Sequence, residues 1–363
     1  MSKWEWKEFE DCIERVKYTT KIPSKDYLQE GEFPIVSQED CLISGYWNDR
    51  SDLFKVTKPI VIFGDHTKVL KYIDFDFVLG ADGVKILCPK NYLNAHFFFY
   101  FLKSVNFDNL GYARHYRLLK ELSVPIPPLS EQKRIVKFLD EEFSKIDTLK
   151  TNAETNLKNA KELFETTLEK ELNPPSRHSE RSEKSSAELP SGWEWKKFGE
   201  VCEIICGQDY KNVECESGAY PVYGSGGVIG YAREFRCPAN CTIVGRKGSI
   251  NNPMYVEEPF WNIDTAFGLS AKECMESKYL FYFCKCFDFT TLDKSSGRPS
   301  LARKDLLEIQ IPLPPLSVQK EIVARLDKLS EDVKRLEANY KQIIANCDEL
   351  KKSILKKTFE RES

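Results

Sequence analysis

The sequence predicts an α+β protein made of two similar domains, each followed by a long helix, and three observations lead to this prediction. A Trp-Glu-Trp-Lys word occurs at residue 4 and again at residue 193. A longer segment, PIPPLSEQKRIVKFLD at 125–140, returns as PLPPLSVQKEIVARLD at 312–327 with most positions identical. Heptad-spaced apolar residues follow each copy of the longer segment. Together these repeats indicate a tandem duplication of a domain-sized unit.

The first part of each copy is expected to be a mixed domain, domain 1 at 1–128 and domain 2 at 192–315. Both parts combine short strand-like runs with Gly, Asn and Pro turns. Weaker matches keep the copies in register, because IVIFG ending at Gly64 faces CTIVG ending at Gly245. Gly45-Tyr46 likewise faces Gly230-Tyr231. One helix is predicted near the end of each domain, at about 92–105 and about 277–287.

The second part of each copy is predicted to be a long helix, at 129–173 and at 316–363. The paired prolines of each PPLS word prevent a helix upstream. Apolar residues then recur in steps of four and three, a heptad seam that is regular in the second helix and looser in the first. The seam positions used below are Leu139, Ile146, Leu149, Leu326, Leu329, Val333, Leu336, Ile343 and Leu350. A polar, Ser-rich linker is expected at 174–191.

Two seams in one chain favour an antiparallel coiled coil between the two helices. This pairing would place the domains at opposite ends, related by an approximate two-fold axis. Pairing between molecules is the alternative, but the internal partner has the higher effective concentration. Leu336 and Ile343 are expected to be buried in the helix pair.

Composition is that of an ordinary globular protein, with 41% hydrophobic and 30% charged residues. The charged, aromatic N-terminus predicts no signal peptide, and a cytoplasmic location is expected. The 12 cysteines lack CxxC pairs and zinc-ribbon spacing, so buried thiols are favoured over a metal site. No metal is therefore expected.

Local charge suggests DNA contact, although the net charge is −3. GYARHYRLLK at 111–120 and KSSGRPSLARK at 294–304 are basic, contain no acid, and lie at roughly equivalent places in the two copies. A single basic window is usually a solvated loop, but two matching windows favour a nucleic-acid surface. The predicted DNA-binding residues are His66, Lys68, Arg114, Tyr116, Arg117, Gln208, Lys211, Arg246, Lys247, Ser249, Ser295 and Arg298. Arg and Lys suit phosphate and guanine, and Gln suits adenine.

Enzyme signatures are not found. GSGGVIG at 224 lacks the dinucleotide-binding spacing, and GRKGS at 245 lacks the phosphate-loop frame. NPPS at 173 has Ser176 where a base-stacking aromatic would be needed. The second copy, from Gly192 on, has no histidine. A duplicated enzyme would be expected to duplicate its catalytic groups, so no catalytic residue is predicted.

The doubled word Pro-Pro-Leu-Ser-x-Gln-Lys, each time opening a long helix after an α+β domain, resembles the specificity subunit of type I restriction–modification systems. The resemblance covers essentially the whole chain, and GWEWKKFGEVCEIICGQ at 192 is similar to the family's entry into a target-recognition domain. The second copy departs from the family at Val318, where Glu is frequent.

The resemblance implies a non-catalytic DNA-recognition subunit. Each domain would bind one half of a bipartite, asymmetric DNA site. The helices would hold the domains apart and dock two methyltransferase subunits that carry S-adenosylmethionine. Separate restriction subunits would supply translocation and cleavage with ATP and Mg, so no cofactor is expected in this chain. The alternatives are a coiled-coil scaffold with two protein-binding domains and no DNA role, and an enzyme in its own right.

Overall fold

The computed structural model describes residues 4–106, 114–172, 189–216 and 220–360, and these fall into two units. The first unit holds Met1–Glu154 and Lys341–Ser363, and the second holds Thr155–Tyr340. Each unit therefore contains one of the two domains together with parts of both long helices. The Ser-rich linker expected from the sequence lies, up to residue 188, outside the described residues.

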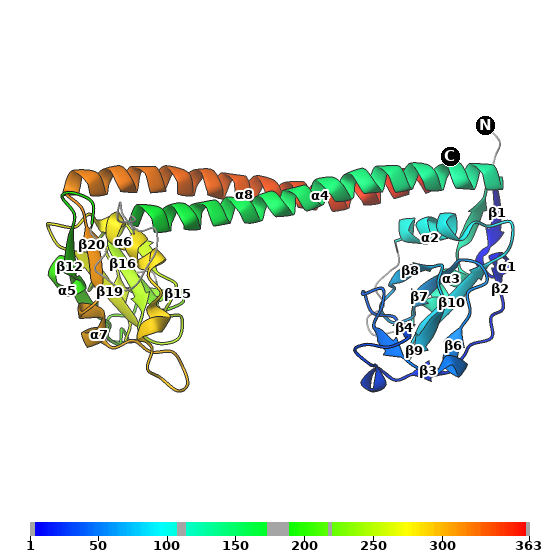
Figure 1. The fold of residues 1–363 in the computed structure, drawn as a ribbon, viewed down its shortest axis with the longest axis horizontal. Coiled ribbons are helices and arrows are strands. Elements are labelled where there is room, and N and C mark those ends of the chain that lie inside the picture. Colours follow the sequence, from blue (N-terminus) through cyan, green and yellow to red (C-terminus); the bar gives the residue numbers. More distant parts are fainter. Residues whose placement is uncertain (1–3, 107–113, 173–188, 217–219, 361–363) are drawn as a thin grey trace. The chain divides into compact units, whose positions relative to one another are not determined.

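Domain 1 contains a two-stranded, a four-stranded and a five-stranded sheet (Figure 1). Their orders are β1-β11, β2-β10-β7-β8 and β3-β9-β4-β5, with β6 also paired to β9. The strands are β1 (Glu5–Glu8), β2 (Ile13–Glu14), β3 (Lys21–Ile22), β4 (Phe33–Val36), β5 (Gly45–Trp47), β6 (Leu53–Phe54), β7 (Ile60–Gly64), β8 (Leu70–Ile73), β9 (Phe77–Gly80), β10 (Val84–Pro89) and β11 (Ser123–Ile126). The short helices are α1 (Phe9–Cys12), α2 (Ala95–Ser104) and α3 (Tyr116–Lys120), with 3-10 turns η1 (Ser24–Asp26) and η2 (Arg50–Asp52).

Domain 2 repeats this plan with sheets ordered β12-β20, β13-β19-β16-β17 and β15-β14-β18. The strands are β12 (Glu194–Lys197), β13 (Cys202–Cys206), β14 (Tyr220–Gly224), β15 (Gly227–Ala232), β16 (Cys241–Gly245), β17 (Met254–Val256), β18 (Trp261–Asn262), β19 (Ala266–Ala271) and β20 (Gln310–Leu313). The helices are α5 (Phe198–Val201), α6 (Ser277–Cys286) and α7 (Arg303–Leu307), with the 3-10 turn η3 (Phe289–Leu292). The two helices predicted near the ends of the domains are α2 and α6, and the α+β fold with an internal repeat is confirmed.

The central strands of the two four-stranded sheets are the equivalent runs IVIFG and CTIVG. Every residue of β7 and of β16 is buried. Each strand pairs on both sides, β7 with β10 and β8, and β16 with β19 and β17. A strand covered on both faces needs apolar side chains at every position, which explains why these runs do not alternate.

The repeated Trp-Glu-Trp-Lys word forms the strand that closes each domain. In domain 1, β1 pairs antiparallel with β11, and Trp6 lies opposite Pro125. In domain 2, β12 pairs antiparallel with β20, and Trp195 lies opposite Pro312. The partner strand in both cases is the segment directly before the PPLS word. The two repeated motifs are therefore partners, and together they join the first strand of a domain to the start of its long helix.

The glutamine of each PPLSxQK word fixes the long helix to the short helix of its own domain. Gln132 is fully buried; its Oε1 accepts from Asn94 N–H at 2.7 Å and its Nε2 donates to the carbonyls of Tyr92 and Pro127. Gln319 makes the equivalent three bonds in domain 2, accepting from Glu276 N–H and donating to two carbonyls. Asn94 and Glu276 are the N-caps of α2 and α6. The glutamine thus connects the first turn of the long helix to the N-cap residue of the short helix.

The long helices are α4 (Leu129–Leu172) and α8 (Leu316–Phe359). In the first unit Lys150 pairs with Asp348 at 2.8 Å and Lys351 with Asp147 at 2.5 Å, so the two segments run antiparallel. In the second unit Arg325 pairs with Glu171 at 2.6 Å. The predicted packing of two long helices against each other is confirmed.

Each helix ends on the domain of the other copy. Leu355 and Phe359 of α8 belong to the apolar core of domain 1. Leu168 and Leu172 of α4 belong to the core of domain 2. This is why the two units combine residues from both sequence copies.

The prediction that Leu336 and Ile343 are buried in the helix pair is wrong. Their side chains are 38% and 41% exposed. Leu149 and Leu350, at the same heptad position, are also exposed. Two helices bury only the residues near their line of contact, and the second apolar position of each heptad lies at its flank. The buried seam residues are Leu139, Ile146, Leu326 and Val333, with Leu329 half-buried.

Candidate nucleic-acid interface

The central strand of each domain ends in a glycine that begins a tight turn. A Cβ added at Gly64 would collide with Thr67 Oγ1, and one at Gly245 would collide with the carbonyl of Ser249. Both positions therefore require glycine, because the turn folds directly back over them. The predicted site residues His66 and Lys68 lie in the first turn, and Arg246, Lys247 and Ser249 lie in the second.

In the first unit this turn is bonded to the basic window of domain 1. Asp65 is buried; its carbonyl accepts from His115 N–H at 2.7 Å, and its Oδ1 accepts from Tyr116 N–H at 2.8 Å. Lys85 lies 3.7 Å from the same carboxylate. Arg114 and Arg117 flank these residues and are exposed. The structure thus brings the predicted residues of 66–68 and 114–117 together on one surface.

The side chains of this window are not all equally available. His115 is buried with its Nδ1 3.1 Å from the carbonyl of Asp65. Tyr116 is half-buried against Phe9, and burial raises the pKa of its phenol. Lys85 and Lys120 lie over the same ring, 5.2 and 5.9 Å from its centroid. The Tyr116 ring therefore packs beneath two lysines, and the exposed cations of the window are Arg114, Arg117 and Lys120.

In the second unit the equivalent bonds join the turn after β16 to the basic window of domain 2. Leu301 N–H donates to the carbonyl of Arg246 at 2.8 Å, and Gly248 N–H donates to the carbonyl of Pro299 at 2.9 Å. Arg298 lies against Gly248, where an added Cβ would come within 2.8 Å of its Nη2. The same connection as in domain 1 is therefore made with different residues.

A cavity of about 560 Å³ opens beside this junction, and its lining is rich in cations. The polar and charged groups in its wall are Arg246, Lys294, Ser295, Ser300, Arg303, Lys304 and Asp305. Asp293 organises the loop, accepting from the backbone N–H and the hydroxyl of Ser295 and from Ser300 N–H, and these bonds lower the pKa of its carboxyl. Four of these side chains are cationic and one is anionic, so the wall of the cavity carries a net positive charge.

Gln208 and Lys211 lie in the segment that connects β13 to β14. Gln208 Oε1 accepts from Arg236 Nη1 at 2.7 Å, so this amide already has a partner within the protein. Arg236 in turn lies over Trp261, 5.2 Å from the ring centroid, and donates to the carbonyl of Cys206, which lines the cavity. The sequence did not point to Arg236, because Glu234 and Phe235 separate it from Arg233 and no basic window is formed there.

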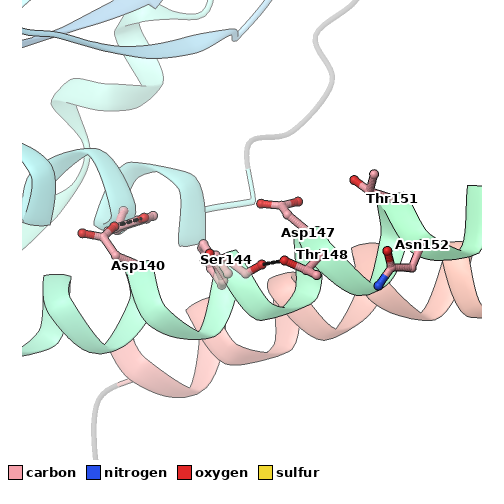
Figure 2. Close-up of a pocket in the computed structure, with 8 residues that line it drawn as sticks. Asp140, Ser144, Asp147, Thr148, Thr151 and Asn152 are labelled. Carbon is pink, nitrogen blue, oxygen red and sulfur yellow. Dashed lines mark hydrogen bonds between the residues drawn. The ribbon is translucent and has the colours of Figure 1, made fainter. Parts of the chain in front are cut away.

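A second groove, of about 550 Å³, lies in the first unit along α4 (Figure 2). Its labelled lining includes Asp140, Ser144, Asp147 and Thr148. Tyr100 donates to Asp140 Oδ1 at 2.5 Å. Two carboxylates disfavour a phosphate backbone here, so this groove does not extend the basic surface.

Two further properties bear on function. Within the described residues, no helix is long and apolar enough to cross a membrane. Over the same part of the chain, no group of three or more His, Cys, Asp or Glu side chains is arranged to hold a metal ion.

Comparison with known proteins reveals a match to one family. A family model described as the type I restriction modification DNA specificity domain matches residues 1–159 and 190–345. The type I restriction enzyme MjaVIII specificity subunit of Methanocaldococcus jannaschii is 24% identical, over 92% of this chain and 88% of its own length. The EcoDI specificity subunit of Escherichia coli is 26% identical, over 67% of this chain and 63% of its own. A specificity subunit relative from Haemophilus influenzae matches over only 37% of its length, at 28% identity.

Solved structures show the same fold. A chain from a study of complex assembly and conformational transition of the type I R-M system superposes with a TM-score of 0.76, at 19% identity, over 99% of this chain and 98% of that one. The HsdS subunit from Thermoanaerobacter tengcongensis superposes with a TM-score of 0.60, at 19% identity, over 98% and 96%. Since the family model matches most of the chain in two successive copies, the chain belongs to the DNA specificity subunits of type I restriction–modification systems, the non-catalytic subunits of these complexes.

Proposed function

We propose that domain 1 and domain 2 each read one half of a bipartite, asymmetric DNA site. The observation that supports this proposal is a hydrogen-bonded connection between a turn and a basic window, which occurs in both domains. In both domains the turn after the central buried strand is joined by backbone hydrogen bonds to a basic window, through Asp65 in one and Arg246 in the other. The shared backbone gives two equivalent reading surfaces, and their different side chains give two different half-sites.

The exposed arginines are the groups best suited to this role. Arg114 and Arg117 serve domain 1, and Arg298 serves domain 2. Arginine binds guanine through two parallel hydrogen bonds in the major groove and also binds phosphate. Asp65 and Asp293 contribute by fixing the loops that carry these arginines.

The long helices are proposed to dock two methyltransferase subunits, as the family resemblance implies. The exposed apolar positions support this proposal, because they match between the copies. Leu149 corresponds to Leu336, and Leu163 corresponds to Leu350, at the same offset that relates the two PPLS words. Apolar rows left exposed on a helix pair favour packing with further helices. S-adenosylmethionine would then be carried by the methyltransferase subunits, and ATP and Mg by restriction subunits.

Substitution of Arg298 by Ala in the assembled methyltransferase complex tests the proposal. If Arg298 contacts a guanine, affinity falls by ~1–3 kcal/mol and preference at one base pair is relaxed. If it contacts phosphate, binding weakens for all sequences and the salt slope falls by about one. Binding selection on randomised DNA measures both effects. The control is Arg335→Ala, which removes an exposed arginine from α8, where it pairs with Asp332.

In either case the preference within the other half-site is expected to persist. Loss of preference in both halves would contradict two independent readers. A wild-type complex with no sequence preference at all would instead favour a scaffold that binds only proteins.

A further inference from the structure

Each domain exposes a pair of adjacent aliphatic residues at the tip of a hairpin. In domain 1 these are Leu42 and Ile43, 49% and 39% exposed, in the loop between β4 and β5. In domain 2 they are Val228 and Ile229, 51% and 50% exposed, at the start of β15. A single exposed aliphatic side chain needs no explanation. Two such pairs at matching places do require an explanation. One lies shortly before Gly45-Tyr46 and the other directly before Gly230-Tyr231, the equivalent dipeptides of the two copies.

In the first unit the hairpin tip is fixed beside the turn that carries His66 and Lys68. Thr67 Oγ1 donates to the carbonyl of Gln38 at 2.6 Å, and His66 N–H donates to Gln38 Oε1 at 3.2 Å. The buried amine of Lys71 donates to the carbonyls of Ser37 and Cys41. The loop that presents Leu42 and Ile43 is therefore held on the same surface as the basic window.

In the second unit Thr265 makes the corresponding connection. Its carbonyl accepts from the N–H groups of Arg246 and Lys247, at 2.8 and 3.2 Å. A Cβ added at Gly224 would lie 3.6 Å from Thr265 Oγ1 and 3.8 Å from Ile229 Cγ2. The hairpin tip and the turn after β16 thus meet at one residue.

The strand register shows how domain 2 presents this pair. Tyr223 lies opposite Val228 and Val222 lies opposite Gly230, so Ile229 has no opposite residue and forms a bulge. A bulge redirects a side chain and increases the local twist of a hairpin. An aliphatic side chain placed at a bulge next to a basic surface is thereby directed outward.

We propose that the two aliphatic pairs are apolar wedges, each entering a groove of the half-site bound by its own domain and partly unstacking a base step. Proteins that deform DNA use Leu and Ile side chains in this way, while neighbouring cations hold the phosphates. Glu39 and Asp40 precede the pair in domain 1, so the phosphates beside that tip would have to be held by the cations of the neighbouring basic window. This inference rests on the proposed reading of two half-sites.

The test uses the assembled methyltransferase complex with Val228→Thr and Ile229→Thr combined. Threonine keeps the β-branching and removes apolar surface, so the hairpin is expected to fold. The reciprocal variant, in domain 1, is Leu42→Thr with Ile43→Thr. The site is first located by sequencing the bases methylated by the wild-type complex, and 2-aminopurine is then placed at successive adenines of each half other than the methylated ones, which the methyltransferase itself extrudes.

Wild type is expected to increase 2-aminopurine fluorescence at one step in each half-site. The domain 2 variant should abolish the increase in one half only and weaken binding about ten-fold, with an unchanged salt slope because no charge is lost. The domain 1 variant should do the same in the other half. Specific wild-type binding with fluorescence and affinity unchanged in both variants would overturn the wedge. A wild-type complex without specific methylation would instead overturn the proposed function.

Discussion

Gln132 and Gln319 show why the PPLSxQK word recurs unchanged at that position. Each side chain uses one acceptor and two donor bonds, all to backbone groups of its own domain. Only asparagine offers the same uncharged acceptor and two donors, and its side chain is one methylene shorter. The motif is therefore a structural joint between domain and helix, whereas the residues proposed to read DNA lie in loops that differ between the copies.

A second contact joins the short helix of each domain to its long helix, through residues at corresponding positions that differ in charge, His96 and Lys278. In the first unit His96 stacks between Tyr72 and Tyr100, with ring centroids 4.6 and 4.8 Å apart, and its Nε2 lies 3.4 Å from Asp140. In the second unit Lys278 lies 2.8 Å from Asp327, whose other carboxylate oxygen accepts from Tyr282. The hydrogen bond to Asp327 raises the pKa of Lys278, while burial lowers the pKa of His96.

This difference predicts a pH dependence in the first unit only. Because the folded-state pKa of His96 is lowered, the unfolded chain binds the proton more readily. The stabilising contribution is present above about pH 6.5 and is lost as the pH falls below it. After correction for the intrinsic pH dependence of exchange, the protection factors of the α2 amides should therefore fall as the pH is lowered from about 7.5 to about 5.5. The fall should be smaller in His96→Gln. Greater protection of wild type at low pH would mean that the attraction of Asp140 and Asp74 outweighs burial.

At the scale of the elements, the last turn of α8 belongs to the core of domain 1. The ring of Phe359 lies 5.3 Å from Phe97 and 5.7 Å from Phe101, measured between centroids. Phe359→Ala should therefore cost about 3–5 kcal/mol and act on domain 1, although the residue lies at the other end of the sequence. Hydrogen exchange resolved by domain measures this effect, with the exposed Leu350→Ala as control. A loss of protection in domain 2 instead would contradict the assignment.

The helix flank and the helix seam are expected to respond differently to the same substitution. Leu336→Asp places a charge on an exposed flank, so thermal melting should stay close to wild type while the methyltransferase subunits no longer copurify. Val333→Asp, three residues earlier in the same helix, places a charge in the buried seam and should cost several kcal/mol, about 3 or more. Retained assembly in a folded Leu336→Asp variant would show that the partner binds elsewhere.

At the scale of the whole molecule, the duplication predicts modular recognition. Each domain is closed by its own strand pair, β1 with β11 or β12 with β20, and connects to its helix through its own glutamine. Exchange of residues 190–315 for the same region of a relative should change one half of the methylated sequence and leave the other intact. Sequencing of methylated bases measures the outcome. A change in both halves would mean that the domains do not read DNA separately.

Several features of this molecule were fixed by local sequence. The prolines before Leu129 and Leu316 and the heptad steps after them predicted both long helices, because helix start and period depend on neighbouring residues. The apolar runs ending at Gly64 and Gly245 predicted strands for the same reason. Repetition then identified the two domains and the family resemblance.

Other features depended on contacts between distant residues. Sequence pattern indicated that Leu336 and Val333 belong to one seam, but only the packing of two helices, with no third, decides that one is exposed and the other buried. Likewise, Arg236 forms a hydrogen bond with Gln208, and Thr67 forms one with Gln38, because the order of the strands in the sheets brings their loops together. Helix periodicity and turn-forming residues act over a few neighbouring positions, so the sequence reveals them. Burial, and the approach of one loop to another, depend on pairings between distant segments, which the tertiary structure alone decides.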